Sequence, residues 1–263
     1  MFEKILLIGC GNMGGAMLAG WLAAGADPAR FTVVDPMLAE SPAGVTLLRA
    51  LPEGRFDAVL LGVKPQLLDA VASDLARLTH GTVVLSILAG IELASLAARF
   101  PEARGHVRIM PNLAAAIGKS PVALAAQGLD AAARAAVTML MQPLGTPEWL
   151  DESQFDAVTA LAGSGPAFVY RFIDALVSGA VALGLPAEQA QRLALATVEG
   201  AGLLAAASPH APAELARRVA SPGGTTQAGL DVLDEGEALS RLLAATLKAA
   251  ADRGAEMAKA ARS

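Results

Sequence analysis

The chain has 263 residues, enough for one large domain or two of ordinary size. Hydrophobic residues make up 54% of the sequence and charged residues only 17%, against about 25% in an average domain, so much of the chain must be buried and disorder is excluded. The net charge of −5 comes with no basic stripe, which excludes nucleic acid and an anionic membrane as the main partner.

Cysteine and histidine are scarce. The single cysteine, Cys10, cannot form an intrachain disulfide, and the three isolated histidines offer no ligand set at zinc spacing. We therefore expect a metal-free protein of the cytoplasm. Residues 5–26 carry no charge, but glycines and Asn12 interrupt their apolar run, so we expect neither a membrane span nor a signal peptide.

The first half of the chain alternates short β-rich runs with helical stretches. The runs are almost continuously apolar and are bounded by Gly, Pro, Asp or Asn, as is typical of parallel strands covered on both faces. This pattern predicts an α/β fold, a Rossmann-like doubly wound parallel sheet over residues 1–152. The six expected strands are residues 5–8, 31–34, 58–61, 82–85, 107–109 and 122–124.

A glycine-rich motif of the form G-x-G-x-x-G follows the first strand and opens a helix. Gly9 permits the tight turn, Gly11 allows the backbone to approach a pyrophosphate, and Gly14 allows close packing of helix on strand. Asp35 ends the second strand 21 residues later, where an acceptor for both ribose hydroxyls is expected. The motif predicts a dinucleotide site whose candidate residues are Gly9, Gly11, Asn12, Met13, Gly14 and Asp35.

Cys10 lies inside this motif, and we interpret it as a small residue in a crowded turn. A catalytic thiol needs a neighbouring base, and the sequence offers no evident partner.

Two further segments follow strands at the edge where doubly wound sheets bind ligands. Val63, Lys64 and Pro65 come directly after the third strand, and Lys64 either contacts the cofactor or is a solvated lysine. Asn112 follows the fifth strand. It either hydrogen-bonds the nicotinamide or substrate, or it forms a turn.

Beyond Asp151 the strand signal stops, and Pro or Gly separates one helix from the next. We expect an all-α domain over residues 153–263, with Ser164 as the N-cap of a helix that Pro166 opens and Gly184 ends. Its apolar surface is too large to hide alone, which predicts subunit pairing. The alternative is a monomer in which that surface packs on the first domain.

The segment from Ser221 to Thr226 reads Ser-Pro-Gly-Gly-Thr-Thr at the entrance of a helix. Two glycines and two hydroxyls there can form a nest of N–H donors suited to a carboxylate. The same residues equally suit an interhelical turn.

Taken together, the motifs resemble those of the pyrroline-5-carboxylate reductase family in order and spacing, over almost the whole chain. The Ser-Pro-Gly-Gly-Thr-Thr segment is specific to that family, whereas many dehydrogenases share the first motif. The resemblance rests on residues 9–14, 63–65, 110–112, 162–166 and 221–226.

The resemblance implies reduction of 1-pyrroline-5-carboxylate to L-proline by NADH or NADPH, the last step of proline biosynthesis. It also implies a C-terminal all-α dimerisation domain that interlocks in a homodimer, and such dimers often assemble into decamers. Backbone N–H groups of Gly223, Gly224 and Thr225, with Ser221, would bind the substrate carboxylate. The hydroxyl of Thr226 would face the ring nitrogen as the catalytic group.

The implied chemistry depends on orientation, because an imine of this kind is readily protonated near neutral pH. Positioning alone can lower a barrier by several kcal/mol, and the sequence indeed lacks a His, Cys or buried-lysine constellation. One departure concerns Leu113-Ala114, where the family usually has Thr-Pro. It places the shape of the nicotinamide pocket in question.

The cofactor expectation comes from Asp35, whose charge would repel the 2′-phosphate of NADPH. Pro36 and Met37 offer that phosphate no side-chain donor, and the next basic residue in the chain is Arg49. We expect a preference for NADH of about tenfold, the factor that corresponds to about 1.4 kcal/mol.

Three other functions remain open on sequence grounds. The chain can be a reductase of another cyclic imine, a β-hydroxyacid dehydrogenase, or a module that senses NAD(P)(H) without catalysis. The dehydrogenase alternative requires a lysine on the first long helix of the second domain, and the chain has none between Lys119 and Lys248.

Overall fold

The computed structural model describes residues 2–262. The chain divides into two compact units: the first runs to Ser164 and also includes the residues from Ala249 onward, and the second is Gly165–Lys248. This division falls later than the domain boundary predicted between residues 152 and 153, because Phe155 packs into a buried cluster of the first unit. Each unit is described by itself below.

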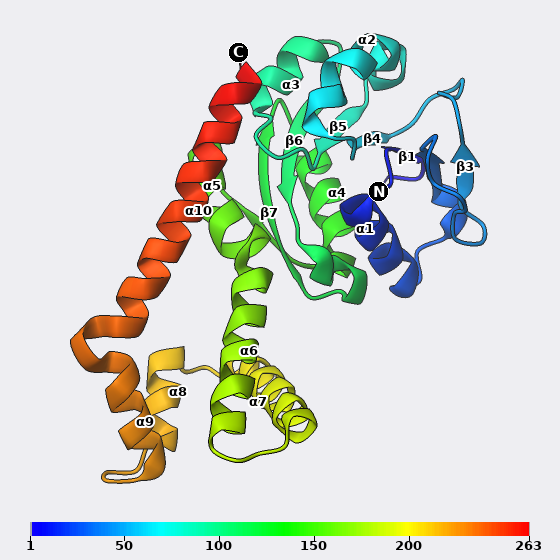
Figure 1. The fold of residues 1–263 in the computed structure, drawn as a ribbon. Helices are drawn as coiled ribbons and strands as arrows, with labels where there is room; N and C mark the ends of the chain where they lie inside the picture. The colour runs from blue at the N-terminus through cyan, green and yellow to red at the C-terminus, as the bar shows by residue number, and fades with distance from the viewer. Residues whose placement is uncertain (1, 263) are drawn as a thin grey trace. The chain divides into compact units, whose positions relative to one another are not determined.

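The first unit contains one eight-stranded sheet with the strand order β3-β2-β1-β4-β5-β6-β7-β8 (Figure 1). The strands are β1 Ile5–Ile8, β2 Phe31–Val34, β3 Thr46–Leu48, β4 Ala58–Leu61, β5 Val83–Ser86, β6 Gly105–Met110, β7 Ser120–Gln127 and β8 Gly145–Trp149. From β3 to β6 all neighbours are parallel. Parallel strands at the centre and helices on both faces confirm the predicted doubly wound α/β class.

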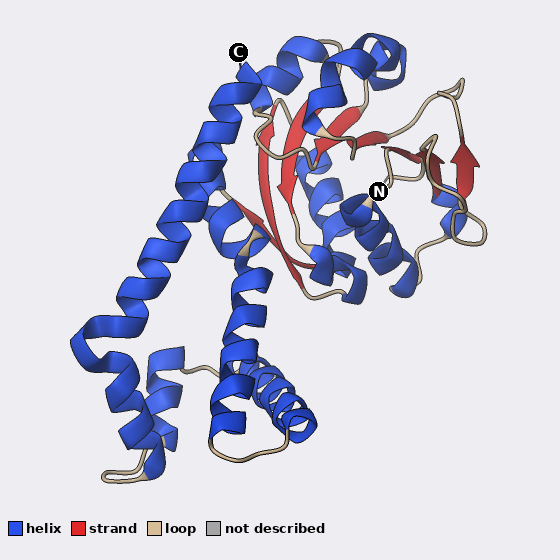
Figure 2. Ribbon diagram, viewed as in Figure 1, coloured by secondary structure: helices blue, strands red, loops and turns tan. Residues whose placement is uncertain are grey.

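Helices cover both faces of the sheet, because alternate residues of each apolar strand point to opposite sides. Leu7 belongs to the core that contains residues of α1 and α4, and Leu6 belongs to the core that contains residues of α2 and α3. Figure 2 shows the red strands between these blue helices. The helices are α1 Asn12–Ala23, α2 Leu68–Thr79, α3 Leu93–Arg99, α4 Ala131–Met141 and α5 Phe155–Val158.

The sheet differs from the prediction at its edges. β7 runs antiparallel to β6, because only residues 111–119 connect the two, and a parallel crossover needs a dozen residues or more. β3 and β8 were not predicted: β3 has only three residues, and β8 contains Pro147, which is tolerated at an edge.

The predicted N-cap at Ser164 is wrong. Ser164 has helical dihedral angles, φ −86° and ψ −23°, and its N–H donates to Thr159 O over 2.9 Å. An N-cap has extended dihedral angles instead. The chain enters α6 through a π-helical turn, Thr159–Gly163, rather than through a capped start.

The second unit is helical, as predicted. Its helices are α6 Gly165–Ala182, α7 Ala187–Ala207, α8 Pro212–Val219, α9 Thr225–Asp234 and the first part of α10 Ala238–Arg262. Gly184, with φ +99°, follows the end of α6 as expected.

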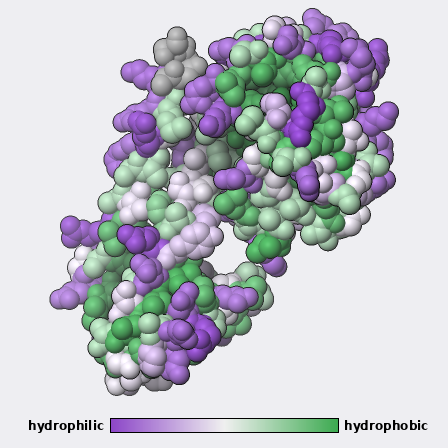
Figure 3. Space-filling view, turned by 45° about the vertical axis from the view of Figure 1, so that its right-hand side comes forward, coloured by the Kyte–Doolittle hydropathy of each residue, from purple (hydrophilic) through white to green (hydrophobic). Residues whose placement is uncertain are grey.

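The helices of the second unit expose much of their apolar surface within a single chain. Figure 3 shows green, hydrophobic residues at the surface of this unit, in the lower part of the view. Among residues 165–248 only Ala190 and Ala194 are buried, and large exposed side chains include Phe172, Leu193 and Leu204. So large an exposed apolar area marks an interaction surface.

Among the described residues, no helix has both the length and the apolarity required to cross a bilayer.

Candidate functional site

The three glycines of the turn after β1 differ in their steric surroundings. Gly9 has φ +85°, and a Cβ there would lie 3.0 Å from backbone atoms of Gly62. A Cβ at Gly14 would lie 3.2 Å from Gly9 O, so the helix packs close to the strand end. At Gly11 a Cβ would meet no atom within 4 Å. The fold therefore needs glycine at positions 9 and 14, whereas Gly11 faces open space.

The N-terminus of α1 begins at this open position. Gly11 is the N-cap residue and no side chain caps the helix. The N–H groups of Asn12, Met13 and Gly14 have no acceptor within the helix, because the first turn of an α-helix leaves its donors unpaired. Those donors and the helix dipole favour an anion. Together with the open space at Gly11 this arrangement fits a pyrophosphate.

Asp35 lies next to this turn, at the carboxyl end of β2. Its Oδ2 accepts from Cys10 N at 2.8 Å, and its Oδ1 accepts from Met37 N at 2.8 Å and Leu38 N at 3.1 Å. Partial burial alone would raise the pKa of this carboxyl, but the three N–H donors and the nearby Arg49 charge outweigh it and lower the pKa. Asp35 is therefore ionised at neutral pH.

The three N–H bonds limit what Asp35 can still accept. A carboxylate offers about four lone-pair positions, and the chain's own backbone uses three of them. A ligand at Asp35 would therefore share the carboxylate with three backbone N–H groups. The expected bonds to both ribose hydroxyls stay a prediction.

The segment after β4 reaches the same edge of the sheet. A Cβ at Gly9 would lie 3.0 Å from Val63 N, which places this segment against the glycine-rich turn. Lys64 precedes the 3-10 turn Pro65–Leu67, and its side chain is exposed. The structure thus brings together the glycine-rich turn, Asp35 and residues 63–65.

Asn112 is buried, and its side chain is used within the protein. Its Nδ2 donates to Ala162 O at 2.9 Å, and its Oδ1 accepts from Ala114 N at 3.0 Å. Its own N–H donates to Ser120 Oγ at 2.9 Å. These contacts favour the turn-forming alternative that the sequence left open.

Cys10 is buried, and burial together with the nearby Asp35 charge raises the pKa of its thiol. A protonated, enclosed thiol is a poor nucleophile, as the sequence interpretation expected. Residues 2–262 also contain no group of three or more side chains that could hold a metal ion.

The Ser-Pro-Gly-Gly-Thr-Thr segment forms the entrance of α9 in the second unit. Gly223 has φ +70° and Gly224 is the N-cap residue, so Thr225 and Thr226 begin the helix with exposed side chains. Gly224 N donates to Ser221 O at 2.9 Å, so this N–H is engaged in the turn itself. Of the three predicted backbone donors, Gly223 and Thr225 are those not engaged by this turn bond.

One glycine at this edge of the sheet, Gly62, was missed by sequence reasoning. A Cβ at Gly62 would lie 2.7 Å from Gly9 O, so the ends of β1 and β4 meet at two glycines. The position of Gly62 directly after an apolar run was an available signal. Arg49 was noted in the sequence as the next basic residue after Asp35, but its contacts with the loop after β2 were not predicted, because those partners lie 10 to 14 residues earlier in the chain.

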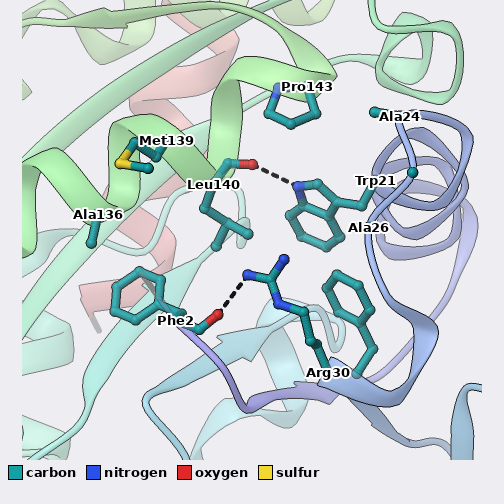
Figure 4. A pocket seen from close by; sticks show the side chains of 11 residues that line it. Phe2, Trp21, Ala24, Ala26, Arg30, Ala136, Met139, Leu140 and Pro143 are labelled. Atoms are coloured by element: carbon teal, nitrogen blue, oxygen red, sulfur yellow. Dashed lines mark hydrogen bonds between the residues drawn. The ribbon is translucent and has the colours of Figure 1, made fainter.

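A separate cavity of about 210 Å³ lies at the amino ends of strands β1 and β2, away from the glycine-rich turn (Figure 4). Phe2 and Arg30, which line it, precede β1 and β2. Trp21 Nε1 donates to Leu140 O at 2.7 Å, and Arg30 Nη2 donates to Phe2 O at 2.5 Å. A site at the amino ends of the strands is not the edge at which doubly wound sheets bind dinucleotides.

Comparison with known families gives two matches. The family model described as pyrroline-5-carboxylate reductase dimerisation matches residues 152–257, and the model described as NADP oxidoreductase coenzyme F420-dependent matches residues 4–90.

Individual relatives match over nearly the whole chain. A pyrroline-5-carboxylate reductase of Pseudomonas aeruginosa is 37% identical over 97% of both chains. The solved pyrroline-5-carboxylate reductase of Coxiella burnetii has a TM-score of 0.89 at 30% identity, covering 97% of this chain and 98% of that one. The Plasmodium falciparum pyrroline carboxylate reductase, solved with NADP bound, has the same fold, with a TM-score of 0.84 at 23% identity and the same coverage.

Proposed function

This chain belongs to the pyrroline-5-carboxylate reductase family, and on that premise we propose that it reduces 1-pyrroline-5-carboxylate to L-proline with a nicotinamide cofactor. The imine nitrogen is protonated before the transfer, and the reaction adds a hydride to C5 of this protonated C=N bond, so the ring nitrogen becomes a secondary amine. In this role the chain catalyses the last step of proline biosynthesis.

The observation that carries the proposal is the open position of Gly11 at the uncapped N-terminus of α1. The unpaired N–H groups of the first turn of α1 directly follow this position, where an added Cβ would meet no protein atom within 4 Å. The cofactor residues proposed are those of this turn together with Asp35 and the segment after β4, namely Gly9, Gly11, Asn12, Met13, Gly14, Asp35, Val63, Lys64 and Pro65. Asn112 supports this edge from within its turn.

The substrate carboxylate is proposed to bind at the entrance of α9. A helix N-terminus attracts an anion through its unpaired N–H groups and its dipole. Gly223 and Thr225 are the proposed backbone donors, and the engaged N–H of Gly224 serves instead to fix the shape of the turn. The Thr226 hydroxyl is proposed to face the ring nitrogen.

The chain's residues act by holding and orienting the reactants. When bound, the reduced nicotinamide supplies the hydride. Ser221 and Gly224 hold the turn through their backbone hydrogen bond, and Thr226 fixes the ring nitrogen with its hydroxyl, so that one face of the C=N bond is presented. Holding two reactants in a reactive geometry can supply several kcal/mol of the barrier reduction.

We also propose that NADH is preferred over NADPH. Asp35 is ionised and partly buried at the ribose end of the site, where a 2′-phosphate would bring a second negative charge. Two unit charges about 4 to 6 Å apart repel by roughly 1 to 2 kcal/mol at an effective dielectric constant near 20 to 40. Arg49 beside Asp35 weakens this repulsion, and how much is tested below.

The proposed assembly is a homodimer formed through the second unit. The exposed apolar helix faces and the match to a dimerisation model support it. A decamer and a cytoplasmic location, expected from the resemblance and from the lone cysteine, stay predictions.

The proposed function is tested by following cofactor oxidation with purified protein. NADH and NADPH are each compared with 1-pyrroline-5-carboxylate and with 1-pyrroline, which is the same ring without its carboxylate. Turnover with 1-pyrroline-5-carboxylate and much weaker turnover with 1-pyrroline are expected. Equal kcat/KM values for both imines would mean that no carboxylate site operates.

A further inference from the structure

The loop after β2, residues 35–45, is longer than a typical connection and has no helix. Residues 35–45 connect β2 to β3 without forming a helical element. A loop of this kind at the edge of the cofactor site needs other interactions to hold its shape, because it lacks the repeated backbone hydrogen bonds of a helix.

Arg49, just beyond β3, binds this loop through its guanidinium group. Its Nη1 donates to Asp35 O at 2.7 Å and also to Leu38 O, and its Nη2 donates to Ala39 O at 3.2 Å. One planar group thus gathers three carbonyl oxygens of residues 35–39. Arginine can do this because its donors are fixed in a fork, whereas lysine has a single nitrogen.

The Asp35 carboxylate holds the same loop through its N–H groups. It accepts from Met37 N and Leu38 N, and its bond from Cys10 N fastens the loop to the glycine-rich turn. The Arg49 cation therefore binds the carbonyl groups of this loop, and the Asp35 carboxylate binds its N–H groups. Between them, Arg49 and Asp35 fix the backbone next to which the adenosine ribose would lie.

We propose that Arg49 is a positioning and specificity residue for the adenosine half of the dinucleotide. This inference rests on the proposed function, since it assigns Arg49 to the same cofactor site. Arg49 acts through the loop and Asp35, so its loss weakens binding of the adenosine half of either cofactor. Its charge beside Asp35 also offsets repulsion of a 2′-phosphate, so its loss penalises NADPH more than NADH.

The test uses two variants that separate the fork of donors from the charge. Arg49→Met removes both, and Arg49→Lys keeps the charge but replaces the two donating nitrogens of the fork with one. Arg55→Met is the matched control, since Arg55 is an exposed arginine that precedes β4 at the opposite edge of the sheet. Titration calorimetry measures the Kd of ADP-ribose, NADH and NADPH, and steady-state kinetics gives kcat and the KM for 1-pyrroline-5-carboxylate.

For Arg49→Met we expect ADP-ribose and NADH to bind about tenfold more weakly, a change that corresponds to about 1.4 kcal/mol. NADPH should lose more affinity than NADH, while kcat at saturating cofactor and the KM for the imine stay unchanged. Arg49→Lys should weaken both cofactors to a similar extent and keep the wild-type ratio of their Kd values. Arg55→Met should match the wild type.

The outcomes separate this inference from the proposed function. Unchanged ADP-ribose and NADH affinity in both Arg49 variants would overturn the inference alone. A fall in kcat, or a rise in the KM for the imine, as large as the loss of cofactor affinity would show a general structural role and would also overturn it. A wild-type protein that binds neither cofactor would overturn both.

Discussion

Replacing Gly11 with alanine separates the needs of the fold from the needs of the cofactor. Gly11 has φ −71° and ψ −161°, an extended conformation that any residue adopts, and the added Cβ meets no protein atom within 4 Å. The free energy of unfolding should therefore fall by about 1 kcal/mol or less, and this small loss comes from alanine being a poorer N-cap residue than glycine.

The same methyl group should strongly impair cofactor binding. It would occupy the space through which a pyrophosphate approaches the N–H groups of α1, and overpacking of a fitted site costs about 1 to 3 kcal/mol. That range corresponds to roughly 5- to 150-fold weaker NADH binding, at 1.4 kcal/mol per tenfold.

Gly9→Ala should behave in the opposite way. Its φ of +85° costs an L-residue about 1 to 2 kcal/mol, and its Cβ would lie 3.0 Å from the Gly62 backbone. We therefore expect a loss of stability of about 2 kcal/mol or more, since crowding adds to the dihedral cost.

Denaturant unfolding and calorimetric titration with NADH, applied to both variants, distinguish the two effects. Gly15→Ala is the control, because its Cβ would make only an ordinary contact, 3.9 Å from Cys10 O. If Gly11→Ala binds NADH as tightly as the wild type does, then the pyrophosphate does not approach at Gly11, and the assignment of this turn is wrong.

Three further predictions concern the substrate, the assembly and the pH dependence of stability. Thr226→Ala should lower kcat/KM for 1-pyrroline-5-carboxylate with little change in NADH affinity, because it loses about 1.5 to 3 kcal/mol of transition-state stabilisation, the value of a hydrogen bond to a charged group. Thr226→Ser should recover most of this loss, and unchanged steady-state constants in the alanine variant would refute the role. Light scattering should give at least twice the chain mass of 26.6 kDa at micromolar concentration, and a monomer mass would contradict pairing through the second unit. His106 is buried, and burial lowers the pKa of its imidazole despite its contact with Phe100 O. The folded state therefore binds fewer protons than the unfolded state does. The stability that neutral His106 contributes is present above about pH 6.5 and is lost as the pH falls through the lowered pKa. His106→Gln should flatten this pH dependence, whereas the exposed His80→Gln control should not.

The parts of the site that a local pattern determines could be predicted from the sequence. The spacing of Gly9, Gly11 and Gly14 after an apolar run determined the turn and the helix start, and the structure has β1, β2 and β4 at the predicted bounds. Each of these features depends on neighbours within a few residues, so the residue order contains the needed information.

The rest depends on partners that are distant in the sequence. The Asn112 side chain is occupied by Ala162 O, 50 residues later, and Arg49 reaches back across a strand to Asp35 O. The local hydrogen bond from Gly224 N to Ser221 O was also not predicted. The same residues are typical both of an interhelical turn and of an anion-binding nest. A glycine-rich segment shows that a turn or a nest is possible, but not which donors the turn itself consumes.

The most direct measurement of the central claim is isotope transfer with NADH that is deuterated at C4 of the reduced nicotinamide, on one face or on the other in two separate samples. The protein is incubated with the labelled cofactor and 1-pyrroline-5-carboxylate, and the product is analysed by mass spectrometry and NMR. NADH labelled on one face of C4 should give L-proline that carries one deuterium at C5, in an amount equal to the NADH oxidised, whereas NADH labelled on the other face should give unlabelled L-proline. Cofactor oxidation that gives labelled L-proline with neither labelled face, or no oxidation of either NADH or NADPH, would contradict the proposed reaction.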